Sequence, residues 1–543
     1  MLYFIPAWYQ ENRWCENEQN WHARRMRTEF DDTVKHIQLF HRSGAYPFEI
    51  MLLSFAPNFR HFLHRQSVYH APYWSCFDAI QEIERKSIRM LSFHNLNWPE
   101  HVEFVYTPFV VNAYLRGEKY AQIEFGEDGN PIQIDMYKNG EIHRRNIYDD
   151  RGFVSSTILY EHATPIHQDY LTEKGIWKMR IFFCDGHVEI NPKSISYLLK
   201  YGGEKYKKIF SKTKYESLEE VIYEVSSSYI ELTKKDDLFC VAMHELHTNL
   251  LQRALRNKKK ILSFFSNRYD ISNHKKDITM IKSANYIIAD SEDNIRKIKN
   301  EIDTTLEHIT DITPFDSRVD FGISQQLNVQ KILVPVDGMG DVRFEELIQR
   351  LGEYLPQNDN VRIHLFTRLA AYGRKRQILD RTRECLGKAG MEEDWATEES
   401  IGLVAENQFE DTDAVPVKFF VEQCVDELSV SKCLREQRII VDMRYTTELY
   451  LRIAGISVGI PQIVCAKSQF VEHGQNGFVL SDMSNMSEAM SYYLDSLKNW
   501  NEAMVYSFEL GKKYTTKVLI DKWKEVIDFV RHDSSITTGD DRF

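Results

Sequence analysis

Residues 437–480 decide the fold and read QRIIVDMRYTTELYLRIAGISVGIPQIVCAKSQFVEHGQNGFVL. The apolar run at 439–441 is short enough for a buried strand, and apolar side chains at helical spacing follow it at 449–453. A glycine and a proline then precede a second strand-like run at 463–465. The pattern predicts a strand, helix, strand unit of an open parallel sheet. Because such sheets bind ligands beyond the carboxyl ends of their strands, we expect the loop at 444–448 to face a ligand crevice.

The composition is that of an ordinary globular protein. Of the 543 residues, 43% are hydrophobic and 27% are charged, so the chain is long enough for two to four domains. The formal net charge of -12 argues against a general nucleic-acid binder, which needs a basic face. The eight cysteines include no Cys-x-x-Cys pair, and this pattern favours reduced thiols over disulfides or a metal site.

The amino-terminal residues MLYFIPAWYQ contain an apolar run without preceding basic residues. We therefore expect neither a signal peptide nor a membrane span, and a cytoplasmic protein. Two basic clusters, at 205–214 and 253–260, are interpreted as solvated helix faces. The alternative for these clusters is peripheral contact with the anionic inner face of the membrane.

Strand-like runs alternate with helical patterns in two separate parts of the chain. Runs at 2–5 and 50–55 come first, and runs at 238–243, 260–266 and 286–289 come much later. Such alternation is typical of a parallel sheet covered by helices. We predict one Rossmann-like domain that is built from both parts.

The stretch between these two parts has a period of two instead. Apolar and polar residues alternate at 132–136 and 177–183, and the sequences GEDGNP, KNGE and Asp185-Gly186 separate such runs. Asn-Gly and Asp-Gly between alternating runs are strong hairpin signals. We predict an antiparallel sheet inserted into the first domain, with its far face solvated or bound to a partner.

The stretch at 437–480 also resembles the carboxyl-terminal domain of GT-B glycosyltransferases. The landmarks of that domain are present as Gly459, Pro461, Gly477 and Phe478. The family places two glutamates before them, which hold the donor sugar and its ribose. Thr446 and Ala454 occupy those two positions here, so both carboxylate acceptors are missing. The nearby Glu448 lies out of register with the pattern.

The sequence KILVPVDGMGDVRFEELIQRL at 331–351 resembles the strand, loop and helix that open the same domain. In the family an Arg and a Lys grip the donor diphosphate at this place. Asp337 and Val342 stand at those positions, and the basic residue Arg343 is one position away. Like charges in contact repel by about 4 kcal/mol at an intermediate dielectric constant, so Asp337 would disfavour a phosphate. The resemblance implies a GT-B scaffold whose donor site has decayed.

Three features together resemble the first accessory secretory protein family of the accessory Sec system, which exports serine-rich repeat adhesins in streptococci and staphylococci. They are YFIPAWY at 3–9, YDDRGFVSS at 148–156 in the inserted sheet, and the degenerate GT-B ending. The resemblance implies an α/β fold with two Rossmann-like domains, and no cofactor or metal. It implies as partners the second and third accessory secretory proteins and the glycosylated adhesin, with the accessory Sec motor ATPase as a further candidate.

The expected domain boundaries follow from these patterns. The first Rossmann-like domain comprises 1–100 and 193–328, and the inserted sheet comprises 101–192. The second Rossmann-like domain spans 329–508. The remaining residues, 509–543, are expected to form a helix and tail that cross back to the first domain.

Two functions fit the sequence. In the first, the chain is a non-catalytic part of a cytosolic complex that binds the glycosylated adhesin and supports its modification and export. The candidate sugar contacts are then His244, His247, Arg444 and Glu448, with a structural hydrogen-bonding role as the alternative for the histidines, whose spacing does not match a zinc motif. In the second, an active retaining GT-B enzyme glycosylates a Ser/Thr-rich protein, with Glu448 and Arg343 replacing the usual residues.

Overall fold

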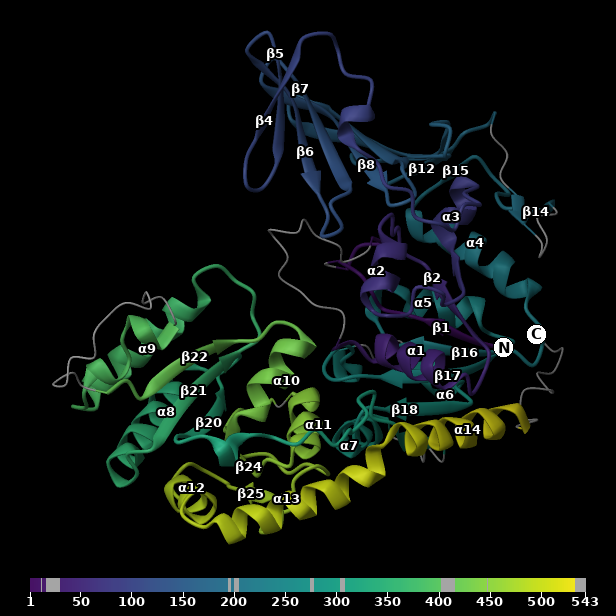
Figure 1. Cartoon of the computed structure of the whole chain (residues 1–543). Coiled ribbons are helices and arrows are strands. Elements are labelled where there is room, and N and C mark those ends of the chain that lie inside the picture. The colour runs from purple at the N-terminus through teal and green to yellow at the C-terminus, as the bar shows by residue number, and fades with distance from the viewer. Residues whose placement is uncertain are drawn as a thin grey trace.

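A computed structural model shows two lobes and a sheet that projects from the first lobe (Figure 1). No helix within the described residues is long and apolar enough to cross a bilayer. The structure describes residues 1–10, 12–15, 30–193, 197–199, 205–273, 278–302, 308–401, 416–446 and 448–532.

The first lobe contains a parallel sheet of seven strands in the order β19-β18-β17-β16-β1-β2-β3. The interior strand β1 (Leu2–Ile5) lies between β2 (Phe48–Leu52) and β16 (Leu238–Ala242), so strands from both sides of the inserted sheet join, as predicted. The other strands are β3 (Tyr73–Ser75), β17 (Lys259–Phe264), β18 (Tyr286–Ala289) and β19 (Ile309–Asp311).

Short polar side chains begin the helices of this lobe. Asp31 accepts hydrogen bonds from the backbone amides of Thr33 and Val34, and Ser291 accepts one from Asn294, which satisfies amides that have no partner inside the helix. The helices are α1 (Asp32–Ser43), α2 (Phe59–Arg65), α3 (Cys76–Gln81), α4 (Leu218–Leu232), α5 (Glu245–Ala254), α6 (Ile278–Lys282) and α7 (Glu292–Glu301).

The inserted sheet has ten antiparallel strands in the order β15-β12-β11-β10-β9-β8-β7-β6-β5-β4. Gly129, Gly140 and Gly186 sit in its tight turns with φ of 79°, 80° and 77°, a left-handed conformation that favours glycine. The sheet extends past the predicted end at 192, because β15 (Lys214–Tyr215) pairs with β12. The other strands are β4 (Val102–Tyr106), β5 (Val111–Leu115), β6 (Glu118–Phe125), β7 (Pro131–Lys138), β8 (Glu141–Asp149), β9 (Phe153–Glu161), β10 (Thr164–Leu171), β11 (Trp177–Phe182) and β12 (Val188–Ile190), beside a separate pair β13 (Tyr197–Leu199) and β14 (Lys205–Lys208).

Buried ion pairs join this sheet to the first lobe at the turn between β8 and β9. Arg151 in the turn donates to Asp78 of α3 (Nη2–Oδ1, 2.8 Å) and to Asp149 (Nε–Oδ1, 2.6 Å). Arg60 of α2 donates to Asp150 (Nε–Oδ1, 2.6 Å) and to Asp149 (Nη2–Oδ1, 3.1 Å). All five residues are buried, and burial raises the pKa of Asp150 to about 6. The YDDRGFVSS segment therefore forms the joint between the sheet and the lobe.

The second lobe contains a parallel sheet in the order β22-β21-β20-β23-β24-β25. The predicted strand, helix, strand unit is present as β23 (Gln437–Asp442), α11 (Leu449–Val458) and β24 (Gln462–Val464). Gly459 ends α11 with a φ of 80°. The other elements are β20 (Gln330–Pro335), β21 (Val361–Thr367), β22 (Phe419–Gln423), β25 (Gly477–Val479), α8 (Asp341–Tyr354), α9 (Arg374–Lys388), α10 (Glu427–Arg435), α12 (Met486–Leu494) and α13 (Leu497–Gly511).

The last helix, α14 (Thr516–His532), leaves the second lobe and packs on the first (Figure 1). Trp523 of this helix is fully buried, and its ring lies 6.1 Å from that of Phe4 and 5.4 Å from that of Phe40. The core of the first lobe therefore includes a residue from beyond the second lobe.

The interpretation of 253–260 as a solvated helix face holds for Arg253 in the last turn of α5 and is wrong for the lysines that lead into β17. Lys260 is in β17, where it is 2% exposed and donates to the backbone oxygen of Leu255 at 3.3 Å. Burial lowers the pKa of its ammonium group to about 8. Lys258 donates to the backbone oxygen of Thr233 at 2.9 Å. In the other cluster, the side chains at 205–208 lie outside the described residues.

Replacing Arg151 by methionine is expected to lower the free energy of unfolding of the first lobe by about 3 to 5 kcal/mol, because Asp78 and Asp149 would lose a buried partner. The matched control is Arg180→Met, which removes a pair with Asp169 on the partly exposed face of the same sheet. That change should cost about 0 to 1 kcal/mol. Urea unfolding followed by circular dichroism measures both, and equal losses would contradict the anchoring role.

Candidate functional site

The loops after β20 and β23 lie side by side at the carboxyl edge of the second sheet. They enclose a pocket of about 400 Å³, which is lined by residues 338–343 and 444–446. The predicted ligand crevice is therefore present in shape. Val342 at the start of α8 is 85% exposed, and Thr446 is also exposed at the pocket wall.

Asp337, in the loop after β20, is bound within the chain. Its carboxylate accepts hydrogen bonds from the Thr367 hydroxyl at 2.7 Å, from the Arg368 backbone amide at 2.7 Å and from Arg374 Nη2 at 3.0 Å. Because Arg374 neutralises this carboxylate, Asp337 repels an approaching phosphate less than a lone aspartate would. Its side chain ties the first loop of the lobe to the end of β21.

Arg343, the basic residue near the predicted diphosphate position, packs against the neighbouring loop. Its Nε donates to the backbone oxygen of Met443, and its guanidinium carbon lies 3.9 Å from the ring centroid of Tyr445. The side chain lines the pocket, so it is the one basic group among the predicted donor-site positions.

Arg444 lies deeper and is 7% exposed. It makes a two-point ion pair with the fully buried Asp442, with Nε–Oδ1 and Nη2–Oδ2 distances of 2.8 and 3.0 Å. Arg452 of α11 also donates to Asp442 at 3.1 Å. Although burial alone would raise the pKa of Asp442, the two guanidinium groups lower it below the usual value. Arg444 therefore holds the end of β23.

Glu448, the residue that begins α11, forms an ion pair with Arg368. The guanidinium carbon of Arg368 lies 3.4 Å from the ring centroid of Phe30, which belongs to the first lobe. Phe30 also packs edge-on against Tyr450 of α11 at 4.8 Å and is 8% exposed. An aromatic ring from the first lobe thus lies over the arginine that pairs with Glu448, the candidate replacement for the family's glutamates.

Ala454 does not share a pocket with Thr446. Ala454 lies on α11, whereas Thr446 lies in the loop before this helix. Ala454 lines a second pocket of about 590 Å³ between α1, α10 and α11. Gly459 lies at the end of α11, where a side chain would collide with Met504 at 2.6 Å. The structure thus brings Val342, Arg343, Arg444 and Thr446 together and separates them from Ala454 and Gly459.

The two histidines lie at the carboxyl edge of the first sheet. His247 is fully buried, donates from Nε2 to the backbone oxygen of Ala242 at 2.8 Å, and accepts at Nδ1 from the Tyr9 hydroxyl at 2.8 Å. Burial lowers its pKa to about 3, so the ring is neutral. His244 begins α5 and accepts from the Leu246 amide at 3.1 Å. These contacts agree with the structural, hydrogen-bonding role that was the alternative for both residues.

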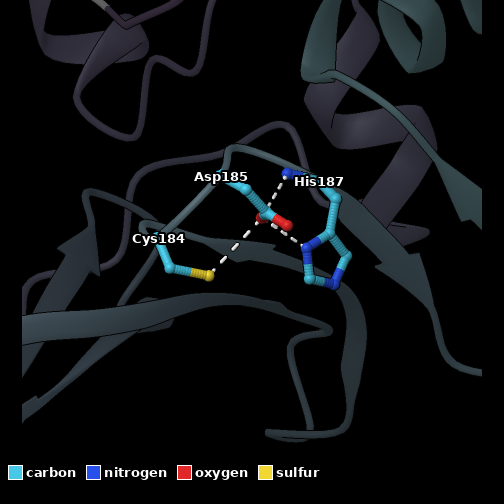
Figure 2. A group of neighbouring side chains, drawn as sticks. All are labelled: Cys184, Asp185 and His187. Carbon is cyan, nitrogen blue, oxygen red and sulfur yellow. Dashed lines mark hydrogen bonds and ion pairs between the residues drawn. The ribbon is translucent and has the colours of Figure 1, made fainter.

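An exposed turn after β11 gathers three side chains of metal-ligand type, as Figure 2 shows: Cys184, Asp185 and His187. The Asp185 carboxylate accepts from the backbone amide of His187 at 3.1 Å and from its ring, and the hydrogen bond from the ring lowers the pKa of Asp185. A short aspartate side chain commonly stabilises a turn in this way. The cluster is therefore explained as turn structure.

Sequence patterns did not identify Phe30, Arg368 or Arg374 as part of the cleft. Arg368 follows a predicted strand almost directly, so its position at the carboxyl edge was available as a signal. Phe30 carried no such signal, because its role depends on contact between the lobes.

The arrangement of the lobes matches known glycosyltransferases. The pneumococcal O-GlcNAc transferase GtfA, solved in complex with UDP and GlcNAc, aligns over 98% of this chain and 99% of its own, with a TM-score of 0.69 and 11% identity. At that identity the likeness establishes the fold alone, and the predicted GT-B fold is confirmed.

The family follows from closer likenesses. The family model for accessory secretory protein 1 of the accessory Sec system matches residues 1–529. The corresponding accessory Sec system protein of Streptococcus gordonii is 32% identical over 538 residues, which cover 97% of this chain and 100% of that protein. The crystal structure of accessory secretory protein 1, 2 and 3 in Streptococcus pneumoniae aligns over 98% of this chain and 99% of that chain, with a TM-score of 0.77 and 29% identity. The chain therefore belongs to the accessory secretory protein 1 family of the accessory Sec system.

Proposed function

We propose that this accessory Sec component is non-catalytic and acts in a cytoplasmic complex with the second and third accessory secretory proteins. In that complex it binds the glycosylated serine-rich adhesin and supports its modification and export. The pneumococcal structure of accessory secretory proteins 1, 2 and 3 resembles this chain over nearly its whole length, which supports these partners.

The contact of Glu448 with Arg368 and of Arg368 with Phe30 carries the non-catalytic part of the proposal. A glycosyltransferase needs groups that bind the transition state more tightly than the substrate, and such groups must be able to reach it. The carboxylate of Glu448 is held by Arg368, and Phe30 covers that guanidinium group from the other lobe. A sugar that bound Glu448 would have to compete with Arg368 for the carboxylate.

The other charges in the cleft support the same proposal. Asp337 is held by Arg374, and Arg444 is held by Asp442. Removing one member of the buried Asp442–Arg444 pair would leave the other charge uncompensated. These groups therefore stabilise the lobe best while both partners of each pair are present. They are therefore poorly suited to bind and release a nucleotide diphosphate.

One observation favours the alternative, an active retaining glycosyltransferase. The pocket of about 400 Å³ remains at the place where the family binds the donor diphosphate, and Arg343 lines it. A basic side chain near the start of a helix can bind a phosphate. The alternative would therefore use Arg343 for the donor and Glu448 after a rearrangement of Arg368.

Titration of UDP-N-acetylglucosamine into the full chain is expected to give no saturable heat in the micromolar range, because the cleft offers Arg343 without the second basic residue of the family's pair. The matched variants are Arg343→Ala and Val342→Ala, since Val342 is an exposed neighbour on the same helix. Micromolar binding that disappears in Arg343→Ala and persists in Val342→Ala would refute the proposal and support the enzyme.

Co-expression of the tagged chain with the second and third accessory secretory proteins and an adhesin fragment tests the binding part. Affinity purification is expected to retain both accessory proteins, and to retain the glycosylated fragment more strongly than the unglycosylated one. The ratio of the two fragments, read by quantitative immunoblot, is the measurement. Equal or absent retention of both fragments, with the three-protein complex intact, would contradict adhesin binding.

The contact between the lobes gives a further test. Phe30→Ala is expected to lower the free energy of unfolding by about 3 to 5 kcal/mol, because a buried ring between the lobes is removed. Val505→Ala, at a residue of α13 that is 57% exposed, is the control and should cost far less. Urea unfolding measures both variants. An unchanged stability of Phe30→Ala would mean that the ring contributes little to the contact between the lobes.

A further inference from the structure

Two cysteines and a glutamate converge at the edge of the second lobe, away from the cleft. Glu422 belongs to the edge strand β22, Cys424 follows that strand directly, and Cys433 lies on α10. One carboxylate oxygen and the two sulfur atoms all lie within 4.8 Å of one another. Nothing in the proposed function uses these three side chains.

The local structure fixes this convergence. Asp426 and Ser429 form a reciprocal capping box, which sets the residue at which α10 begins. The helix then returns over the end of β22 and brings Cys433 to Cys424. Cys424 is 4% exposed and Cys433 is half-buried, so the sulfur atoms are largely shielded from water.

A second layer of polar contacts surrounds the cluster. His364 of β21 is 4% exposed, and its Nδ1 lies 3.0 Å from the Glu422 carboxylate. Its ring stacks on Phe420 at 5.2 Å, so the imidazole orientation is fixed. Gln437 donates to the backbone oxygen of Cys433 at 3.1 Å. Metal-binding side chains are commonly held by outer hydrogen bonds of this kind.

The chemistry of the three donors calls for a cation. Each of them is negative when deprotonated, so three such donors at one place can be neutralised by a cation between them. Two sulfur atoms bound to one tetrahedral zinc ion are about 3.8 Å apart, given a Zn–S bond of about 2.3 Å. The three donor atoms lie within 4.8 Å of one another, so side-chain shifts of about 1 Å would complete the geometry.

We propose that Glu422, Cys424 and Cys433 bind one zinc ion, with a water molecule as the fourth ligand and His364 as the outer partner that orients Glu422. Two thiolates favour a borderline-soft ion, and the carboxylate favours a divalent ion over Cu⁺. Binding releases two protons, one from each thiol, and involves no redox step.

The ion would tie α10 to the edge strand, and this position gives it a structural role. Glu427, the first residue of α10, forms an ion pair with Lys35 of the first lobe at 2.5 Å. A zinc ion that holds α10 on the sheet would therefore also hold this contact between the lobes. Because it binds the folded chain and not the unfolded chain, zinc should raise the unfolding temperature.

The experiment uses the full chain, reduced and stripped with a chelator, and then titrated with Zn²⁺ against a chromophoric competitor. One equivalent is expected to bind and to raise Tm. Co²⁺ in place of Zn²⁺ should give a near-ultraviolet sulfur-to-cobalt charge-transfer band. Zn²⁺ should protect Cys424 and Cys433 from alkylation, as mapped by peptide mass spectrometry. These readouts need no variant, so they do not depend on the folding of a mutant chain.

Variants assign the ligands. Cys433→Ser is expected to abolish the cobalt band and the rise in Tm, and His364→Ala to weaken zinc binding by roughly tenfold. The control is Cys184→Ser, which changes the exposed cluster with Asp185 and His187 and should leave binding intact. Failure of the wild-type chain to bind Zn²⁺, loss of binding in Cys184→Ser, or a Cys424–Cys433 disulfide in protein isolated without reductant would each overturn the proposal.

Discussion

Two arginines and three aspartates, buried where the inserted sheet meets the first lobe, set the geometry of that half of the molecule. Arg151 donates two hydrogen bonds to Asp78, and Arg60 donates to both Asp149 and Asp150. Removing such charges from water costs much of what their attraction contributes, so their main effect is on geometry. An apolar contact tolerates sliding, whereas a two-point pair fixes both distance and direction. The sheet therefore has one orientation on the lobe.

The cleft follows the same principle of internal pairing. Asp337, Asp442 and Glu448 each have an arginine partner from the same lobe. Carboxylates and guanidinium groups are the side chains that would bind an activated sugar, and here they bind one another. The second lobe therefore has the shape of a glycosyltransferase domain, but the charged side chains of its cleft are paired with one another. In the proposed non-catalytic role, such a framework would present surfaces to other proteins without the cost of keeping a reactive site open.

Local signals in the sequence were sufficient for most of the fold. Glycines that follow Asn or Asp predicted tight turns, and Gly129 and Gly140 adopt the left-handed conformation that such turns require. Helical spacing next to short apolar runs predicted β23, α11 and β24, because each of these elements is fixed by its own residues.

The details of the site could not be predicted in that way. Ala454 faces a different pocket because the rotation of α11 depends on its packing against α10 and α13. The partner of Glu448, Arg368, follows β21, and the ring that lies over this arginine comes from the other lobe, so no spacing rule connects them. His247 is buried and neutral in contact with Tyr9 from the start of the chain, and no local pattern predicts that contact. Contacts between distant segments decide these features.

Helix α14 is translated after the second lobe but completes the core of the first lobe. Trp523 fills the core beside Phe4 and Phe40, so the first lobe lacks an interior residue while the second lobe is still being translated. A nascent chain therefore exposes the hydrophobic surface around Phe4 and Phe40 until α14 emerges. Chaperones that bind exposed apolar segments would therefore have the longest time to bind this lobe, although it is translated first.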